Sequence, residues 1–525
     1  MLQRLLLSLL GALLLLASIL LWNRHGLGTP CVGNMDRAYT HLSVAMAARG
    51  EAYEGAFSHA GFRHPGPALF YYLAGTSAVL THWMSQEDSF RLAVTLLNCA
   101  SIGLAVFLLS GLTPHRAYSL LLVPISFVII SPRALFDYWN PHPIPAAVIA
   151  YLLALVYLAY GRLRYLPFIV ALGSLIAQCH ISTPPFLAVT LAYALGACVW
   201  RRRMPADQWA LPVVVSVALG AVLWLGPLID FFRYGLDSNI LTIARSFLEE
   251  HRTSPLSRSF IAVWNIASKK LNLFFGLPPD FAKLLPLAFL AAVIGTTPRR
   301  GAFFHVRALI LLSWAMTIWA LTQSFQPMAD YLITYFLGVL TLAATVTVMA
   351  ITDRAAGLIS RMAPIGEEQG RRMLSALALV AVVFSAARHP GLSMVPKRDS
   401  CAPSRFADRF VQSLGPDSTA LYELSPTTLE LRGFSVFFAL QMLGRGAQIC
   451  FDDQWEHYMG RALTCSYRKP RDHFAAAVPV EISLLGKAPP KGHKGGHILK
   501  ERRTIQIDWV DSDGAPHSFS ASTRQ

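Results

Sequence analysis

Long apolar runs recur through the first 390 residues of the chain and are separated by short polar loops. A helix needs about 20 predominantly apolar residues to cross the hydrocarbon core of a bilayer. The runs approach this length, so each predicts a membrane-spanning helix. They lie at about residues 4–22, 91–112, 116–131, 143–160, 165–180, 184–200, 209–229, 281–297, 304–322, 329–351 and 372–388.

The loops between the runs alternate between basic and nearly neutral. One set carries Arg116, Arg162 and Arg164, Arg201 to Arg203, Arg299 and Arg300, and the arginines of loop 352–372. The other set, loops 132–142, 181–183 and 323–328, contains a single basic residue, Arg133. Because basic loops stay on the cytoplasmic side, the first set is predicted to face the cytoplasm.

This asymmetry also decides two doubtful segments. Residues 4–22 are followed by no A-x-A-like cleavage site, so we expect an uncleaved helix with a cytoplasmic N-terminus. A full crossing at 66–82 would turn the later basic loops outward, so this segment is predicted to be a re-entrant or interfacial helix. About 11 crossings follow, with outer loops at about 23–90 and 230–280 and the C-terminus outside.

The composition changes near residue 390, where helical and strand-like patterns alternate with turn residues. The predicted fold is therefore a polytopic α-helical membrane domain, residues 1–390, followed by an extracytoplasmic α/β domain, residues 391–525. Residues 485–500, rich in Gly, Pro and Lys, are expected to form a mobile loop.

Composition agrees with the membrane assignment. Only 14% of the 525 residues are charged and 54% are hydrophobic, whereas about a quarter of the residues of soluble domains are charged. The net charge of +15 is spread over short loops, which argues against a nucleic-acid-binding face. It suits anionic lipid headgroups or phosphate-bearing substrates.

The seven cysteines show no CxxC or Cys/His spacing typical of a zinc site. Cys99, Cys179 and Cys198 fall in apolar runs, whereas the other four fall in segments placed outside the membrane, where disulfides form. Cys450 and Cys465 are the predicted pair.

Polar residues gather in the loops assigned to the outer face. An ionisable residue near the hydrocarbon region is costly unless it is paired or functional, and five clusters on one side predict a common outward-facing cavity. The clusters are Asp36, Arg37, Tyr39, His41, His59, Arg63 and His64; Arg133, Asp137, Trp139, Asn140 and His142; His180; Asp230, Arg233 and Asp237; and residues 322–331.

Structural explanations compete with function at these positions. Asp36 alternatively caps the helix that follows it or pairs with Arg37. The sequence His64-Pro-Gly-Pro alternatively only starts a helix, and His180 alternatively only forms a hydrogen bond at a helix end.

Similar alternatives apply to the second cluster. Tyr138 and Trp139 are also typical of the aromatic belt at a membrane surface. Arg133 and Asp137 stand four residues apart, so they alternatively neutralise each other on one face of a helix.

Several of these motifs resemble the GT-C superfamily of integral-membrane glycosyltransferases, including its protein mannosyltransferase, aminoarabinose transferase and arabinofuranosyltransferase-like members. The resemblance covers about residues 1–350. It is carried by "NMDRAY" with Asp36, by "HPGPALFYYLAG", by the segment from "WNPHPIP" to "QCHISTPPFL", and by "LWLGPLIDFFRYGLDSNI".

The resemblance implies an inverting transferase that moves a sugar from a polyprenyl-phosphate donor to an envelope glycan, lipid or protein. It implies that Asp36 deprotonates the acceptor hydroxyl, and that Arg63, His64, Arg133 or Arg233 holds the phosphate. The substrate-binding residues are then Arg37, Tyr39, Arg63, His64, Arg133, Asp137, Asn140, His142, His180, Asp230 and Arg233. The implied location is the bacterial inner (plasma) membrane, with the C-terminal domain periplasmic or extracellular.

One departure from the superfamily is the position after Asp36, where many relatives carry a second acid and this chain carries Arg37. An inactive scaffold of envelope assembly and a secondary transporter therefore stay as alternatives. No metal-binding motif is evident, and if a divalent cation acts as cofactor, Asp137 is the only candidate ligand in the second outer loop.

Overall fold

The computed structural model describes most of the membrane domain and parts of the C-terminal region. The described residues are 1–28, 35–58, 62–200, 209–249, 254–296, 301–323, 330–362, 369, 407–408, 411–412, 421–426, 432–445, 447–455, 459, 463–465, 478–485, 504–510 and 516–522. The predicted helix at 372–388, the predicted loop at 485–500, and His59, Cys31 and Cys401 lie outside these residues.

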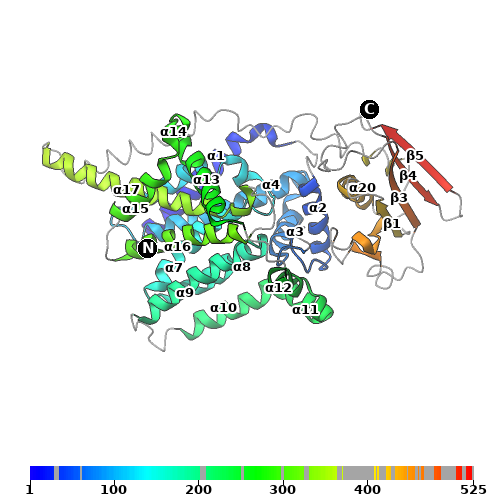
Figure 1. Cartoon of the computed structure of the whole chain (residues 1–525), viewed down its shortest axis with the longest axis horizontal. Helices are drawn as coiled ribbons and strands as arrows, with labels where there is room; N and C mark the ends of the chain where they lie inside the picture. Colours follow the sequence, from blue (N-terminus) through cyan, green and yellow to red (C-terminus); the bar gives the residue numbers. More distant parts are fainter. Residues whose placement is uncertain are drawn as a thin grey trace. The chain divides into compact units, whose positions relative to one another are not determined.

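A helical unit is formed by residues 1–27, 90–228 and 244–394. Every predicted apolar run within the described residues is helical (Figure 1). The main helices are α1 (Leu2–Trp22), α4 (Gln86–Leu109), α5 (Leu122–Ile129), α7 (Ile144–Ala159), α8 (Leu166–Cys179), α9 (Pro184–Trp200), α10 (Ala210–Leu223), α13 (Leu256–Phe275), α15 (Leu285–Thr296), α16 (Ala302–Thr322) and α17 (Phe336–Met362). Shorter helices are α6 (Pro132–Phe136) and α14 (Pro279–Ala282).

Helix α7 forms the centre of this unit. All its residues are buried, as expected for a helix that is apolar on every side. It packs against α8, α9, α16 and α17. Gly338 of α17 lies directly against the carbonyl oxygen of Pro145 in α7, a space that a Cβ atom would fill. Small residues at such crossings let membrane helices approach closely.

Other helices expose apolar side chains, as lipid-facing helices do. Leu5, Leu9 and Leu13 of α1 are exposed, as are Leu211 and Val214 of α10. Among the described residues, four helices are long and apolar enough to cross a membrane, or up to six if each of two bent pairs counts as one span. The chain is thus a multi-pass membrane protein, and the count of about 11 crossings remains a prediction.

A second compact unit joins residues 28–89, 229–243 and 395–525. Its helices include α2 (Met35–Ala48) and α3 (Ala68–Leu80), and the boundary between the units falls within α4, α11 (Leu225–Tyr234) and α12 (Asn239–Glu249). Helix α3 has 13 residues, a length of about 20 Å at 1.5 Å per residue. That is shorter than the ~30 Å hydrocarbon core, which agrees with the prediction of an interfacial helix.

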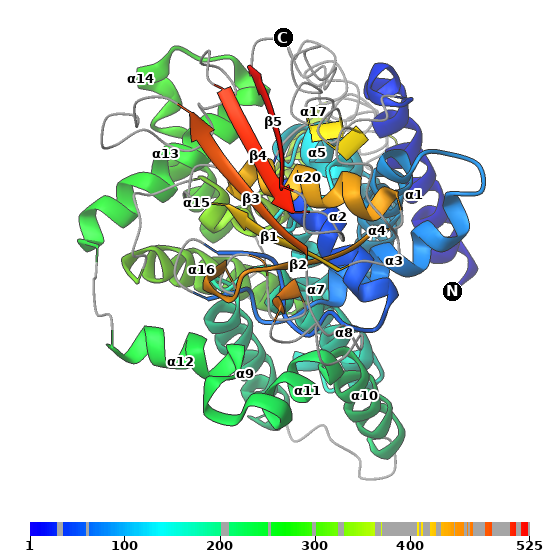
Figure 2. The same cartoon turned by 90° about the vertical axis from the view of Figure 1, so that its right-hand side faces the viewer.

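The C-terminal region of this unit contains a five-stranded sheet in the order β2-β1-β3-β4-β5 (Figure 2). Strands β1 (Leu421–Pro426), β2 (Gln448–Phe451) and β3 (Val478–Leu485) are parallel, whereas β4 (Thr504–Val510) and β5 (Pro516–Ser522) continue the sheet antiparallel. Helix α20 (Arg432–Gly444) packs against β1, β2 and α2. The predicted α/β fold is confirmed.

The predicted disulfide is also present. Cys450 of β2 is bonded to Cys465, with an S–S distance of 2.02 Å. Both cysteines are buried in a cluster with Leu421 of β1, so the bond belongs to the core of this region.

Candidate active site

Asp36 lies in the first turn of α2, and its side chain is exposed. A carboxylate in the first turn of a helix is favoured by the partial positive charge of the unpaired N–H groups there. This position keeps Asp36 as an accessible anion.

Arg37 points into a buried charge cluster. Its Nη1 lies 3.7 Å from Oε1 of Glu87, and Nε2 of His41 lies 2.9 Å from Oε2 of the same carboxylate. All three side chains are buried. Arg37 and His41 are four residues apart and so share a face of α2, while Glu87 comes from the first turn of α4. The charge of Arg37 is therefore balanced by Glu87, a residue the sequence did not single out.

The His64-Pro-Gly-Pro segment forms a tight corner. The Gly55 N–H donates to the His64 carbonyl at 2.9 Å, and the His64 N–H donates to the Ala56 carbonyl at 2.8 Å. A Cβ atom on Gly55 would stand 2.7 Å from the His64 oxygen, so only glycine fits. Helix α3 follows directly, with Pro67 as its N-cap. The corner thus starts a helix, as the structural alternative predicted, and His64 itself is buried.

Asn239 connects this corner to the motif around Asp230. Its Oδ1 accepts from the Arg63 N–H at 3.0 Å, and its Nδ2 donates to the carbonyls of Arg63 and His64 at 3.2 Å each. Asp230 accepts from the Asn239 N–H at 2.7 Å and so caps the start of α12. Two motifs about 170 residues apart in sequence are therefore parts of one structure.

We expect the substitution Asn239→Ala to destabilise this corner by about 2 kcal/mol, because the Arg63 N–H and carbonyl and the His64 carbonyl each lose a buried hydrogen bond. The measurement is the thermal unfolding midpoint of the purified protein. The control is Asn272→Ala, which removes the corresponding bonds of an exposed asparagine to Leu277. Equal midpoints for the two variants would contradict this role of Asn239.

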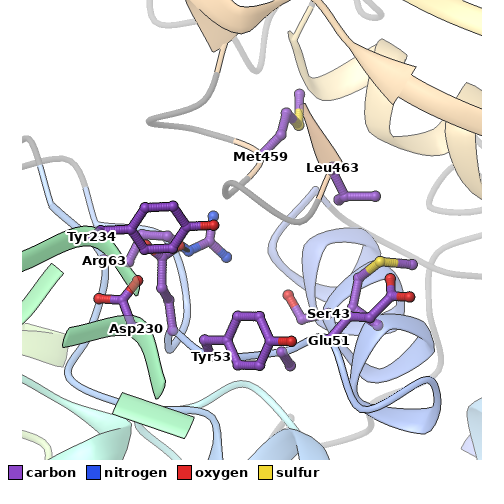
Figure 3. Close-up of a pocket in the computed structure, with 11 residues that line it drawn as sticks. Ser43, Glu51, Tyr53, Arg63, Asp230, Tyr234, Met459 and Leu463 are labelled. Atoms are coloured by element: carbon purple, nitrogen blue, oxygen red, sulfur yellow. Dashed lines mark ion pairs between the residues drawn. The ribbon is translucent and has the colours of Figure 1, made fainter. Parts of the chain in front are cut away.

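The second unit contains a pocket of about 410 Å³, including its open mouth, next to the corner. Its lining residues are Ser43, Met46, Glu51, Ala52, Tyr53, Glu54, Arg63, Asp230, Tyr234, Met459 and Leu463. Figure 3 shows Arg63, Asp230 and Tyr234 on one side, Ser43 and Glu51 on the other, and Met459 and Leu463 above them. Of the predicted site residues, Arg63 and Asp230 line this pocket.

Arg63 is the buried cation of the pocket. Its Nε donates to the Gly55 carbonyl at 3.0 Å and lies 3.5 Å from Oε2 of Glu54. Burial lowers the pKa of the Arg63 guanidinium, while the nearby Glu54 carboxylate raises it. Glu54 is therefore the counter-ion of Arg63.

Tyr53 of the pocket contacts Arg233, another predicted residue. Nη1 of Arg233 donates to the Tyr53 hydroxyl at 3.2 Å, and its guanidinium carbon lies 5.0 Å from the centre of the Tyr53 ring. Arg233 itself is exposed. Tyr39 is buried and stacks on Phe57, with ring centres 5.7 Å apart.

Ser43 lines the pocket and lies on the same helix, α2, as Asp36. The two residues are seven positions apart on α2, so they lie on nearly the same face, separated by about 10 Å along the axis. Asp36 therefore stands about two turns from the pocket lining, on the side of α2 that faces it.

The other predicted residues belong to the helical unit. Asp137 Oδ2 lies 3.2 Å from His142 Nδ1, and Asn140 Nδ2 donates to the Cys179 carbonyl at 2.7 Å. Arg133 is exposed. The proposed neutralisation of Asp137 by Arg133 was therefore wrong: α6 ends at Phe136, before the aspartate.

His180 and its neighbours support structural roles. Nδ1 of His180 lies 2.8 Å from the Ser182 hydroxyl at the end of α8, as the helix-end alternative predicted. His180 is buried, and this contact holds its ring at the helix end. Tyr138 is fully buried against Phe90 and is no belt aromatic, while Trp139 packs against His142.

No group of three or more His, Cys, Asp or Glu side chains in the described part of the chain is arranged as a metal site. Asp137, the candidate ligand of a divalent cation, has His142 as its ionic neighbour.

Sequence reasoning overlooked the acids of the first outer loop. Glu51, Tyr53 and Glu54 line the pocket, and Glu87 balances Arg37. The sequence contained a signal for Glu51 and Glu54, because "GEAYEGAF" places these two acids between "NMDRAY" and "HPGP".

The fold was compared with known proteins. It is similar to the crystal structure of ArnT from Cupriavidus metallidurans bound to undecaprenyl phosphate, with a TM-score of 0.55 and 13% identity over 90% of this chain and 96% of that chain. The apo structure of the same protein gives a TM-score of 0.52 and 14% identity, over 89% and 92% of the chains. The chain therefore shares the fold of this ArnT. No protein-family model and no curated protein sequence match the chain.

This shared fold confirms the predicted architecture, a polytopic helical domain with a C-terminal α/β region. At 13% identity it does not assign roles to individual residues.

Proposed function

We propose that this protein is a membrane glycosyltransferase that moves a sugar from a polyprenyl-phosphate donor to an envelope acceptor on the outer face of the membrane. The observation that carries the proposal is the similarity of its fold to almost the whole of an ArnT chain whose crystal structure contains undecaprenyl phosphate. The pocket about two turns of α2 from Asp36 supports it with acids, tyrosines and Arg63.

The disulfide supports an outer location for the pocket. Disulfides persist in oxidising compartments and are rare in the cytoplasm. The Cys450–Cys465 bond belongs to the same compact unit as the pocket. Together with the basic loops assigned to the cytoplasm, it favours an extracytoplasmic second unit and a cytoplasmic N-terminus.

In the proposed reaction Asp36 is the general base. Its carboxylate takes the proton of the acceptor hydroxyl as the hydroxyl oxygen attacks the anomeric carbon of the donor sugar. The bond between that carbon and the phosphate oxygen breaks, and polyprenyl phosphate leaves with the electron pair. Attack opposite the leaving group inverts the configuration. The exposure of Asp36 leaves it accessible to an acceptor.

Arg233 is the cation proposed to hold the leaving phosphate. It is exposed and is oriented by Tyr53 at the edge of the pocket, whereas the Arg63 guanidinium already has Glu54 beside it. A planar guanidinium matches phosphate oxygens with two parallel hydrogen bonds.

We expect the substitution Arg233→Ala to raise the donor KM or lower kcat so that kcat/KM falls about 10- to 100-fold, the value of a charge-assisted hydrogen bond. The substitution Arg233→Lys is expected to retain part of the activity, because lysine keeps the positive charge but cannot form the two parallel hydrogen bonds of a guanidinium. Arg245→Ala is the control, since Arg245 is also an exposed arginine. Unchanged kcat/KM in Arg233→Ala would contradict the assignment.

The function is tested in cells of the natural host by deleting the gene and comparing envelope glycans. We expect one sugar substituent to disappear in the deletion strain and to return with the wild-type gene. A glycan profile that is unchanged by deletion, together with no sugar transfer in membranes, would contradict the proposal.

A further inference from the structure

The pocket in the second unit has a polar and an apolar part (Figure 3). Its polar wall has Arg63, Asp230 and Tyr234 on one side and Ser43 and Glu51 on the other, and it also includes Tyr53 and Glu54. Its apolar wall consists of Met459 and Leu463, which lie above the polar residues. Such a pocket matches a sugar ring, whose hydroxyl groups form hydrogen bonds and whose C–H faces pack against apolar side chains.

The charge of the polar wall is negative. Three carboxylates line the pocket against a single guanidinium, and that guanidinium lies beside Glu54. Glu51 and Asp230 are buried. A further anion brought into this space would be repelled with little screening by water, whereas carboxylates accept hydrogen bonds from sugar hydroxyls.

The apolar wall comes from the C-terminal region, far away in sequence. Met459 and Leu463 both lie between the two cysteines of the disulfide, and both side chains are buried. The closed segment has a sequence separation of 15 between Cys450 and Cys465, whose Cα atoms are 4.9 Å apart. The bond therefore limits how far this wall can move from the strand that carries Cys450.

Further contacts fix both ends of the segment to the sheet. The Asp452 N–H donates to the Leu424 carbonyl of β1 at 3.3 Å, and the Trp455 N–H donates to the Asp452 carbonyl at 2.9 Å. Thr464 forms a parallel bridge with Phe451 of β2. On the other side, α20 packs against α2, the helix that supplies Ser43 and Met46.

We propose that this pocket selects the sugar of the transfer reaction, that it admits glycosyl groups without negative charge, and that Met459 and Leu463, which lie between the bonded Cys450 and Cys465 in sequence, supply its apolar wall. The inference rests on the proposed function and gives the C-terminal α/β region a role in specificity. The sugar bound there belongs to the donor or to the acceptor, and these two sources share the same chemistry.

Direct binding tests the charge preference without turnover. The full-length protein in nanodiscs is titrated with methyl glycosides of neutral hexoses and pentoses, and each hexoside is paired with the uronide that carries a C6 carboxylate. We expect a neutral glycoside to bind and its uronide to bind at least about tenfold more weakly, with Glu51→Gln narrowing that difference. If no neutral glycoside binds, or if uronides bind equally well, the proposal is wrong.

Variants of the apolar wall test the role of the segment. Met459→Ala and Leu463→Ala are expected to weaken neutral-glycoside binding by about tenfold. The control is Met442→Ala, which removes an equally buried methionine of α20 outside the pocket. The double variant Cys450→Ser/Cys465→Ser, or reduction of the wild-type protein, is expected to weaken binding similarly. Wild-type affinity in Met459→Ala, Leu463→Ala and the reduced protein would overturn the proposal.

Transfer assays separate this inference from the proposed function. Specific glycoside binding by a protein that transfers no sugar would support the sugar-binding pocket and contradict the proposed transferase activity. Sugar transfer that is unaffected by the wall variants would support the transferase activity and contradict the role of the pocket. A change in the donor KM of Met459→Ala places the donor sugar in the pocket, and a change in the acceptor KM places the acceptor there.

Discussion

Replacement of Asp36 by asparagine is expected to lower kcat for sugar transfer by about 10²- to 10⁴-fold, the usual contribution of a general base. The amide is nearly isosteric with the carboxylate but takes no proton. Because Asp36 is exposed in the first turn of α2, the change should leave the fold intact. The measurement is transfer by purified protein in proteoliposomes.

The matched control is Asp280→Asn. Asp280 is an exposed aspartate paired with Lys283 on the surface, so its loss should leave both activity and the unfolding midpoint unchanged. Equal kcat for wild type and a well-folded Asp36→Asn protein would remove Asp36 from the mechanism.

The second large effect is expected at Glu87, where Glu87→Leu should destabilise the protein by about 3 kcal/mol or more. Removing one partner of a buried ion pair leaves the other charge uncompensated, and here Arg37 and His41 both lose their acceptor. Helix α2 carries Arg37 and His41 and also Asp36, so sugar transfer should fall as well. The unfolding midpoint and kcat are the two readouts.

A double variant separates charge from packing. Arg37→Met combined with Glu87→Leu replaces a pair of buried charges by apolar side chains, which is often nearly neutral for stability. We expect the double variant to unfold at a higher temperature than Glu87→Leu alone. If Glu87→Leu is as stable as wild type, the buried cluster does not hold α2 in place.

The sequence predicted the features that depend on local composition. Apolar runs become helices because a segment inside a membrane has to form its backbone hydrogen bonds internally, as an α-helix does, and the described runs are helical. The Cys450–Cys465 pair was predicted from the placement of cysteines outside the membrane and is present. Loop charge predicted that the apolar segment 66–82 does not cross the membrane, and its helix α3 is short.

The parts that sequence did not predict depend on packing between distant segments. Which acid balances Arg37 is decided by the approach of α4 to α2, and Glu87 is 50 residues away. Asn239 meets the corner at Arg63 through a fold that no local pattern encodes. Asp137 pairs with His142 because α6 ends between Arg133 and Asp137.

The lining of the candidate pocket also depends on packing between segments that are distant in sequence. Arg63 and Asp230 were expected near the site because both are ionisable residues of outer loops, and both line the pocket. Met459 and Leu463 have no distinctive sequence pattern and reach the pocket only through the closed segment of the C-terminal region.

The most direct test of the central claim is sugar transfer by the purified wild-type protein. Proteoliposomes containing the protein receive polyprenyl-phosphate-linked sugars and, as acceptor, the envelope fraction of a strain that lacks the gene. We predict that one donor is consumed, that free polyprenyl phosphate appears in equal amount to labelled acceptor, and that the new linkage is inverted. No release of polyprenyl phosphate from any donor, by a protein that is folded and correctly inserted, would contradict the account.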